Sequence, residues 1–174
     1  MTHLLSALLT RATGTSTLEF ARHNLFLPLG IEVKYWTIGP QGYYFGGSEM
    51  YFTSRDMARF GYLYLQGGRV ENQQIIEPDW ISKSFEDYAE KENWSWGAFS
   101  NIGYGYLWWL GILNSYEVYF ALGYGGQYII LIPDLNMIVV TTCNSMLFDW
   151  NLADAQERWV SSLVANFVIP AVID

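Results

Sequence analysis

The second half of the chain consists of short apolar segments separated by turn residues, and this pattern limits the possible folds most strongly. After Gly103, runs rich in aromatic and β-branched residues follow one another, as is typical of strands. Glycine, asparagine and a Pro133-Asp134 pair separate these runs, so neighbouring strands can join through tight turns. We therefore expect an antiparallel meander with strands at Tyr104–Leu110, Tyr116–Leu122, Tyr128–Ile132 and Met137–Thr142.

A helix is expected to close the sheet. Residues 150–169 carry apolar side chains at helical spacing, which is typical of a helix with one face on a core. We expect this helix to run from Trp150 to Ile169 across the sheet. The side chains expected to face inward are Leu152, Ala155, Trp159, Val160, Leu163, Val164 and Phe167.

The first half of the chain reads as helices interrupted by a long irregular segment. Residues 2–12 place leucines on one side of a helix that Gly14 ends, and Ser16 can cap a second helix that stops before Pro28. Residues 27–48 form a glycine-rich loop of a length that is often functional. The next expected element is a hairpin over residues 69–76. It is followed by a helix beginning at Pro78 and by a loop over residues 86–102.

The segment GGSEMYFTSRDMARFGYLYLQGG, residues 46–68, has a helix with signals at both ends. Thr53 can cap the helix, and the Asp56 carboxylate three residues later can reach back to the cap. Gly67-Gly68 ends the apolar face. The fold class is therefore α+β, with a helical and loop region over residues 1–102 and a sheet with a C-terminal helix over residues 103–174.

Composition and charge exclude several classes of function. The chain has 174 residues, of which 51% are hydrophobic, and a net charge of −8, so it can form a core but does not suit a nucleic-acid partner. The sequence has no run of about 18 uncharged apolar residues, so it does not predict a membrane span. Cys143 has no partner for a disulfide, and two histidines argue against a zinc site. We expect neither a metal nor a cofactor.

Residues 46–68 resemble a region of the penicillin-recognising serine hydrolases of the class C β-lactamase and esterase type, which include 6-aminohexanoate-dimer hydrolases. In that family a Gly-Gly-Ser loop leads into a helix reading Ser-x-Asp-Met-Ala-Arg-Phe-Gly. Further segments resemble the family in the same order: HLLSALLTRATG, LFLPLGIEVKYW, YGYLWWL and ALGYGGQYIILIPDLNMIVVTT. The resemblance implies the C-terminal part of a β-lactamase/transpeptidase-like fold, so that residues 1–102 and 103–174 together make one incomplete domain.

The same resemblance implies acyl transfer through a serine. The family uses a Ser-x-x-Lys pair, in which the lysine helps to take the proton of the acylated serine, and a Tyr-x-Asn tyrosine as base or proton relay. Neither motif is present: no serine of the chain has a lysine three residues later. We therefore expect the chain to be the C-terminal portion of a longer hydrolase and to be inactive alone.

One catalytic element of the family has a counterpart in this chain. The family's third motif, on the strand that edges the active site, matches Gly123-Tyr124-Gly125-Gly126. The resemblance implies that the backbone N–H of Tyr124, flanked by Gly123 and Gly125, faces a developing oxyanion. The alternative is that these glycines only form the bend of a hairpin or a bulge. The motif lacks lysine or histidine, so esters and small amides fit better than penicillins.

Other residues are candidates for binding substrate. By resemblance, Tyr43, Gly46 and Gly47 lie on a loop near the cleft of the parent fold, and Trp36 and Trp108 wall it. The alternative for each aromatic residue is ordinary core packing. Asp56 and Arg59 are better explained by helix capping and an ion pair.

Three hypotheses about function follow. The first is that the chain is part of a serine hydrolase that acts on a small ester, amide or β-lactam. The second is a non-catalytic module that binds a hydrophobic or peptide-like ligand in an aromatic cleft. The third is one half of a split enzyme, or a chain that pairs with itself through unfilled sheet edges. The compartment stays open: members of the family are often in the periplasm or cell envelope, and some are cytoplasmic.

Overall fold

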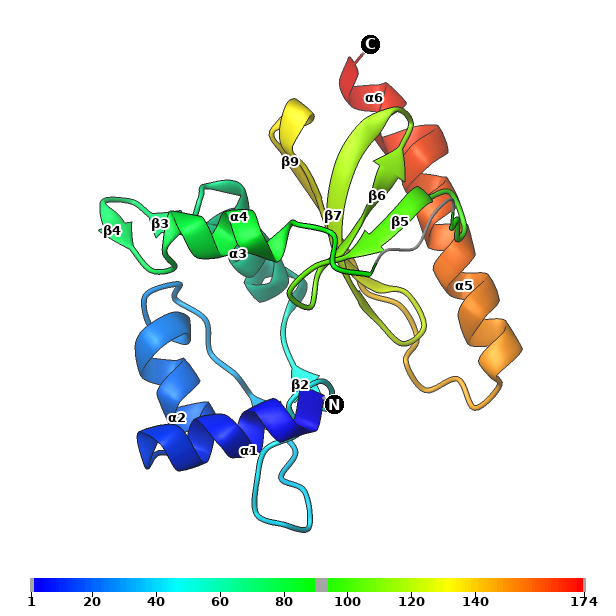
Figure 1. The fold of residues 1–174 in the computed structure, drawn as a ribbon. Coiled ribbons are helices and arrows are strands. Elements are labelled where there is room, and N and C mark those ends of the chain that lie inside the picture. Colours follow the sequence, from blue (N-terminus) through cyan, green and yellow to red (C-terminus); the bar gives the residue numbers. More distant parts are fainter. Residues whose placement is uncertain (1, 90–93, 174) are drawn as a thin grey trace.

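The computed structural model describes residues 2–89 and 94–173. It is an α+β structure in which a five-stranded antiparallel sheet separates two groups of helices (Figure 1). Helix α5 (Trp150–Leu163) covers one face of the sheet, whereas α3 (Ser54–Leu65) and α4 (Pro78–Ser84) lie on the other. Helices α1 (Thr2–Thr13) and α2 (Thr17–Ala21) lie farther from the sheet. The expected fold class is confirmed.

The sheet is a simple meander in which each strand pairs with the next along the chain. The strand order is β5-β6-β7-β8-β9, and every pair is antiparallel. A tight turn is sufficient to connect neighbours of this kind. The strands are β5 (Ser100–Tyr104), β6 (Trp109–Leu113), β7 (Tyr116–Gly123), β8 (Gln127–Ile132) and β9 (Met137–Thr141).

The predicted strand over residues 104–110 is wrong, because this aromatic run contains a turn between β5 and β6. Leu107 has a φ of 64°, and Gly105 lies so close to α4 that a Cβ there would be 2.1 Å from the Ser84 carbonyl oxygen. Four strands were expected in this sheet. The additional strand, β5, lies partly within the loop that was expected over residues 86–102. Residues 90–93 of that expected loop lie outside the described residues.

Strand β8 is buried on both faces. Tyr128, Ile130 and Ile132 belong to the core on the α5 side. Ile129 and Leu131 belong to the core on the side of α3 and α4. A strand covered on both faces needs apolar side chains at successive positions, which explains the uninterrupted sequence YIILI.

The final helix faces the sheet with smaller side chains than expected. Val160, Val164 and Ala165 belong to the core against the sheet, and Ala153 is also buried, so the expectation was right for the two valines. It was wrong for Leu152, Trp159 and Phe167, which are 58%, 64% and 71% exposed, and for Ala155, which is also exposed. Small residues on the inner stripe let the helix lie close to the sheet. Helix α5 also ends earlier than predicted and continues through a π-helical turn, Val164–Val168, to α6 (Pro170–Ile173).

The ends of α3 confirm the signals in its sequence. Thr53 Oγ1 accepts a hydrogen bond from the Asp56 backbone N–H at 3.1 Å, and Asp56 Oδ2 accepts one from the Thr53 N–H at 3.3 Å. Gly67, with a φ of 62°, follows the helix in the left-handed region that glycine favours. Both ends of the helix are therefore determined by local residues.

The remaining elements are short, and several expected features are confirmed. Ser16 Oγ accepts from the Glu19 N–H at 3.2 Å at the start of α2, which continues into a π-helical turn, Arg22–Phe26. Strands β1 (Tyr35–Trp36) and β2 (Met50–Tyr51) pair within and after the long loop, and β3 (Arg69–Val70) pairs with β4 (Gln73–Gln74) as a hairpin. None of the helices in the described part of the chain is long and apolar enough to cross a membrane.

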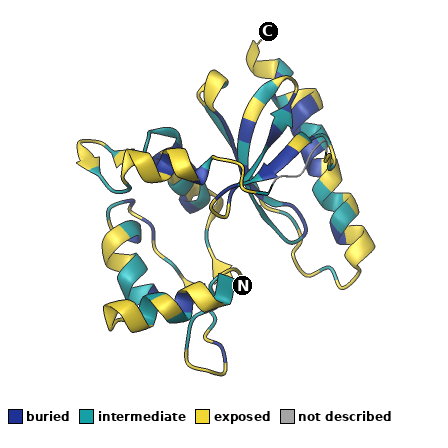
Figure 2. Ribbon diagram, viewed as in Figure 1, coloured by how far each residue is buried: buried dark blue, intermediate teal, exposed yellow. Residues whose placement is uncertain are grey.

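Several helix faces carry exposed apolar side chains. Leu4, Leu5 and Leu8 of α1 are all more than half exposed, although the sequence placed them on one side of the helix. Figure 2 shows much of α1 and of the outer side of α5 as exposed. Exposed apolar patches of this kind are typical of interaction surfaces.

Gly61 permits the close approach of α3 to the sheet, and its replacement tests this packing. A Cβ at this position would lie 2.8 Å from Ile129 Cγ2 and 3.2 Å from Ile138 Cγ2. We expect Gly61→Val to lower the free energy of unfolding by about 1–3 kcal/mol, the usual effect of overpacking. Urea denaturation measures it, with the exposed Arg55→Val on the same helix as a control expected within about 0.5 kcal/mol of the parent. A fully stable Gly61→Val protein would contradict this packing.

Candidate active site

The turn between β7 and β8 has a backbone that requires glycine. Gly125 and Gly126 have φ values of 74° and 91°, a region that other residues rarely occupy. A Cβ on Gly125 would also lie 2.8 Å from the Asn144 carbonyl oxygen. The hairpin alternative for these glycines is thus correct as a description of the backbone, and it does not conflict with a role for the N–H groups of the turn.

Side chains from α5 and β9 hold this turn in place. The Gly125 N–H donates to Glu157 Oε1 at 2.6 Å, and Gln156 Nε2 donates to the Gly125 carbonyl oxygen. Thr141 Oγ1 donates to the Gly126 carbonyl oxygen at 2.8 Å. The turn is therefore attached to two elements outside its own hairpin, which favours a fixed backbone geometry.

Tyr124 is anchored by its side chain, whereas its backbone N–H is available. Its hydroxyl donates to the Leu147 carbonyl oxygen at 2.7 Å, and its ring packs edge-on against Trp150 with a centroid separation of 4.9 Å. Within residues 2–89 and 94–173, the Tyr124 N–H has no hydrogen-bond acceptor. Because Glu157 occupies the Gly125 N–H, Tyr124 rather than Gly125 is the candidate donor to an oxyanion.

Glu157 is a titratable group that binds this turn directly. Burial raises the pKa of its carboxyl group, and the nearby negative charge of Asp154 acts in the same direction. The Gly125 N–H and the Arg158 guanidinium stabilise the ionised form and partly oppose the rise in pKa. The protonation of Glu157 is therefore coupled to the structure of the turn.

The two predicted substrate-binding glycines lie against the start of α1. A Cβ on Gly46 would be 2.2 Å from the Thr2 carbonyl oxygen, and a Cβ on Gly47 would be 2.2 Å from Thr2 Oγ1. Close packing of the loop on α1 is sufficient to explain both glycines. Their role in binding substrate stays a prediction.

The predicted aromatic residues of the long loop have partners within the same region. Trp36 Nε1 donates to the Phe45 carbonyl oxygen at 2.7 Å, and its ring contacts Tyr44. The Tyr43 hydroxyl accepts from Arg11 Nε at 3.3 Å. These contacts order the loop on α1 and leave the proposed binding role of Trp36 and Tyr43 as a prediction.

Trp108 lies in the core. It is 3% exposed, and its ring centroid is 4.8 Å from that of Tyr64 and 5.7 Å from that of Phe85. It packs among residues of α3, α4 and the sheet. The structure therefore places Trp108 in the packing role that was the alternative to a cleft wall.

The start of α3 lies at the same end of the sheet as the β7–β8 turn. Ser54 Oγ is 3.4 Å from Thr142 Oγ1, and the preceding Thr141 binds the turn at Gly126. Farther along α3, Arg59 donates to the Asp56 carboxylate at 3.1 Å and to the Gly30 carbonyl oxygen at 2.6 Å. Asp56 and Arg59 thus serve capping and an ion pair, as expected.

Sequence reasoning missed the residues that hold the turn. Gln156, Glu157 and Thr141 lie 15 to 32 positions from the glycines that they bind, and no local motif links them. The only signal was that polar residues interrupt the apolar pattern of the final helix.

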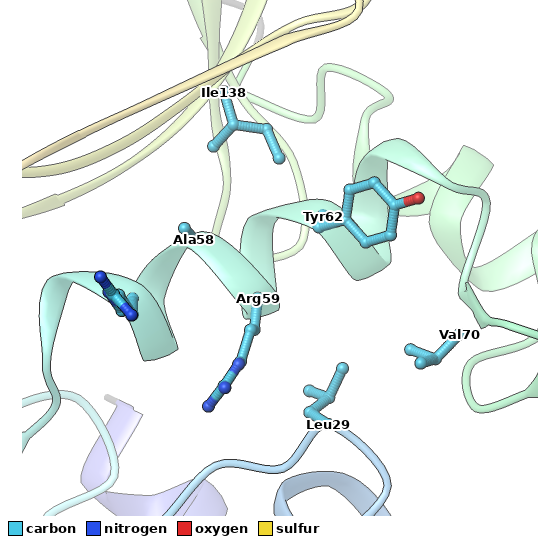
Figure 3. A pocket seen from close by; sticks show the side chains of 7 residues that line it. Leu29, Ala58, Arg59, Tyr62, Val70 and Ile138 are labelled. Atoms are coloured by element: carbon cyan, nitrogen blue, oxygen red, sulfur yellow. The ribbon is translucent and has the colours of Figure 1, made fainter.

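A groove lies beside the edge strand β9, on the α3 side of the sheet. It has a volume of about 410 Å³. Figure 3 shows Ile138 on one side of α3 and Leu29 and Val70 on the other. Its walls are mostly apolar, with two guanidinium groups, and are formed by Leu29, Arg55, Ala58, Arg59, Tyr62, Val70 and Ile138.

The candidate site thus lies in an α+β fold, in which an antiparallel sheet has helices on both faces and a fixed glycine turn at the end of a strand. Residues 1–161 match the Beta-lactamase family. The chain therefore belongs to this family, and the fold is that of a β-lactamase-related serine hydrolase.

Two solved structures share the fold. One is a putative 6-aminohexanoate-dimer hydrolase from Bacillus anthracis, with a TM-score of 0.70 and 22% identity over 92% of this chain and 41% of that chain. The other is an octameric penicillin-binding protein homologue from Pyrococcus abyssi, with a TM-score of 0.54 and 18% identity over 75% of this chain and 34% of that chain. The present chain thus spans less than half the length of either. No significant match exists among curated proteins.

The raised pKa of Glu157 predicts a pH dependence of stability. The folded state keeps the proton at pH values where the unfolded carboxyl group, near its ordinary 4.5, has lost it. Unfolding then releases a proton, so stability falls as the pH rises through this interval. We expect the parent to lose stability relative to Glu157→Gln between about pH 4.5 and the raised pKa.

Urea denaturation of both proteins at several pH values between about 4 and 7.5 measures this difference. Glutamine keeps an acceptor for the Gly125 N–H but does not titrate. The raised pKa of Glu157 would be contradicted if the stability difference between the parent and Glu157→Gln stays constant, or changes in the parent's favour, as the pH rises.

Proposed function

We propose that this chain is the sheet-bearing portion of a serine hydrolase that acts by acyl transfer on a small ester, amide or β-lactam. One observation carries the proposal: Tyr124 has a backbone N–H without an acceptor among the described residues, in a turn that its side chain, α5 and β9 hold in place. Family membership supports the reaction class.

The chemistry requires a donor of this kind. When a serine attacks a carbonyl carbon, the carbonyl oxygen becomes an oxyanion, and a preorganised N–H stabilises it in the transition state. The turn supplies the Tyr124 N–H for this purpose. The Gly125 N–H contributes indirectly, since its bond to Glu157 fixes the backbone next to Tyr124.

The serine nucleophile and its base come from outside these 174 residues. No serine of the chain has the lysine partner that the family mechanism uses. The complement is another portion of the polypeptide or a separate chain, which makes the split-enzyme hypothesis a variant of the same proposal. Its docking surfaces would be the exposed apolar faces of α1 and α5 and the free edge of β9.

Neutral acyl substrates suit this site better than penicillins. At the third-motif position the chain has glycine and tyrosine where lysine or histidine would bind a substrate carboxylate. The overall charge of −8 also disfavours anionic ligands. The similarity to a putative 6-aminohexanoate-dimer hydrolase supports a small amide or ester.

The isolated chain should not react with a serine-directed probe. We expect no covalent adduct after incubation with a fluorophosphonate, because no serine has an activating base. Intact-mass spectrometry measures the adduct, with an active serine hydrolase as a positive control. Stoichiometric labelling of one serine would contradict the proposal that the nucleophile comes from outside these 174 residues.

The role of the Tyr124 N–H is tested in a form of the enzyme that includes the nucleophile. Tyr124→Pro removes this N–H, and we expect kcat to fall about 10²–10³-fold, as for the loss of other oxyanion donors. Tyr124→Phe keeps the N–H and loses only the hydroxyl bond to Leu147, so its kcat should stay close to that of the parent. Equal kcat values for Tyr124→Pro and Tyr124→Phe would contradict the donor role.

The isolated chain should also associate. Large apolar side chains on the outer side of α5 and of the π-helical turn after it are more than half exposed, namely Leu152, Trp159 and Phe167. The edge of β9, which has no further strand among the described residues, can pair with another strand. We expect oligomers by size-exclusion chromatography with light scattering, and less association for the double variant Trp159→Gln/Phe167→Gln. A monodisperse monomer of the parent at every concentration tested would contradict this expectation.

A further inference from the structure

A second cavity lies between the sheet and α5, on the opposite face from the groove at α3. It has a volume of about 160 Å³. Its lining residues come from the segment before β5, from β5, β6 and β7, and from α5: Trp94, Trp96, Ile102, Trp109, Phe120, Leu122 and Glu157. Three indole rings and one carboxylate therefore surround a single small space.

The walls of this cavity are fixed by their own contacts. Trp96 Nε1 donates to Asp154 Oδ1 at 3.1 Å. The ring centroid of Trp109 is 4.6 Å from that of Tyr104 and 5.6 Å from that of Trp94. Ile102 and Phe120, each 1% exposed, belong to the core beneath. A cavity with prearranged walls loses little entropy when it binds a ligand.

The cavity is open to a ligand from solvent and limits its size. Trp94 is 37% exposed, so one wall lies at the surface. A volume of about 160 Å³ corresponds to roughly five water molecules. A head group of a few heavy atoms fits this space, whereas a drug-sized molecule does not.

The charges around the cavity favour a cation. Asp154 and Arg158 form an ion pair at 2.8 Å. Among the described residues Glu157 has no ion-pair partner: its carboxylate accepts from the Gly125 N–H, and the Arg158 guanidinium favours its ionised form without an ion-pair contact. The Arg158 guanidinium carbon lies 5.7 Å from the Trp96 ring centroid, so one of the three indoles already attracts a positive charge. Tryptophan is the aromatic side chain that binds cations best.

We propose that the Trp94–Trp96–Trp109 cavity, with Glu157, binds a small free organic cation of the quaternary-ammonium type. The indole faces and the carboxylate together replace the water around such a head group. This site goes beyond the proposed hydrolase function and does not depend on a nucleophile. Because Glu157 also holds the Gly125 N–H, ligand binding is transmitted to the backbone of the β7–β8 turn.

Choline and its neutral isostere 3,3-dimethylbutan-1-ol test the proposal on the 174-residue chain. We expect saturable choline binding by calorimetry, and about tenfold weaker binding of the neutral isostere, which lacks the cation–π attraction. Two-dimensional NMR should show choline-dependent shifts of the Trp94, Trp96 and Trp109 indole N–H signals and of the Gly125 amide. Equal affinity for the two compounds, or no binding of either, would overturn the proposal.

Matched variants locate the site. We expect Trp94→Leu and Glu157→Gln each to weaken choline binding about tenfold, and Glu157→Gln to leave the binding of the neutral isostere unchanged. Trp159→Leu, at an exposed position of the same helix, should bind choline like the parent. Unchanged affinity in Trp94→Leu, with its thermal unfolding transition intact, would place the binding elsewhere and overturn the proposal.

A lipid head group carries the same ammonium chemistry, and a separate arm distinguishes it. We expect the chain to stay in the supernatant when phosphatidylcholine vesicles are sedimented, since the cavity is small and the ligand is free. If the chain sediments with the vesicles and excess choline prevents this sedimentation, the assignment to a free cation is overturned. The wild-type NMR shifts give a result even if a variant fails to fold.

Discussion

The burial of β8 on both faces is the constraint on which the rest of the structure depends. Ile130 and Ile132 pack toward α5, whereas Ile129 and Leu131 pack toward α3 and α4. A one-residue slip of this strand would exchange the two sets of side chains. The register of β8 against its neighbours is therefore strongly determined, and with it the position of the turn at its start.

This constraint carries through to the candidate site. Gly123 pairs with Gln127 at the end of β7 and β8, so the three residues between them must reverse the chain. Glycines at positions 125 and 126 make the reversal possible. Glu157, on the helix that packs on β8, then binds the turn. The position of the Tyr124 N–H thus follows from core packing together with one carboxylate.

The sequence predicted the elements whose signals are local. The capping box of α3, the Ser16 cap and the hairpin at residues 69–76 depend on neighbouring residues and are present. The meander was also predicted, apart from the turn at Gly105. That turn depends on contact with the end of α4, where Ser84 lies, and a distant residue of this kind leaves no trace in a local pattern.

The side of the final helix that meets the sheet was harder to predict. Hydrophobicity alone favours Trp159 and Phe167 as inner residues, but both are exposed, and Ala153 and Ser161 are buried instead. Close packing selects small side chains where a helix approaches a sheet, and this requirement is visible only in three dimensions. The hydrogen bonds of Glu157 and Thr141 to the turn were also missed, because they join residues that are far apart in the sequence and meet only in three dimensions.

The exposed apolar side chains and the proposed external nucleophile both fit a complement that binds this chain. The chain spans 41% of the length of the structural neighbour with the TM-score of 0.70. Its sheet ends at β9 without a further strand among the described residues, and exposed tryptophan, leucine and phenylalanine side chains lie on the outer side of α5 and of the π-helical turn after it. A complement that covers these surfaces would bury apolar area and could bring a serine to the Tyr124 N–H. In such an assembly, stability and the proposed catalysis would be linked, because β9 and α5, which carry these surfaces, also hold the turn with the proposed oxyanion donor, the Tyr124 N–H.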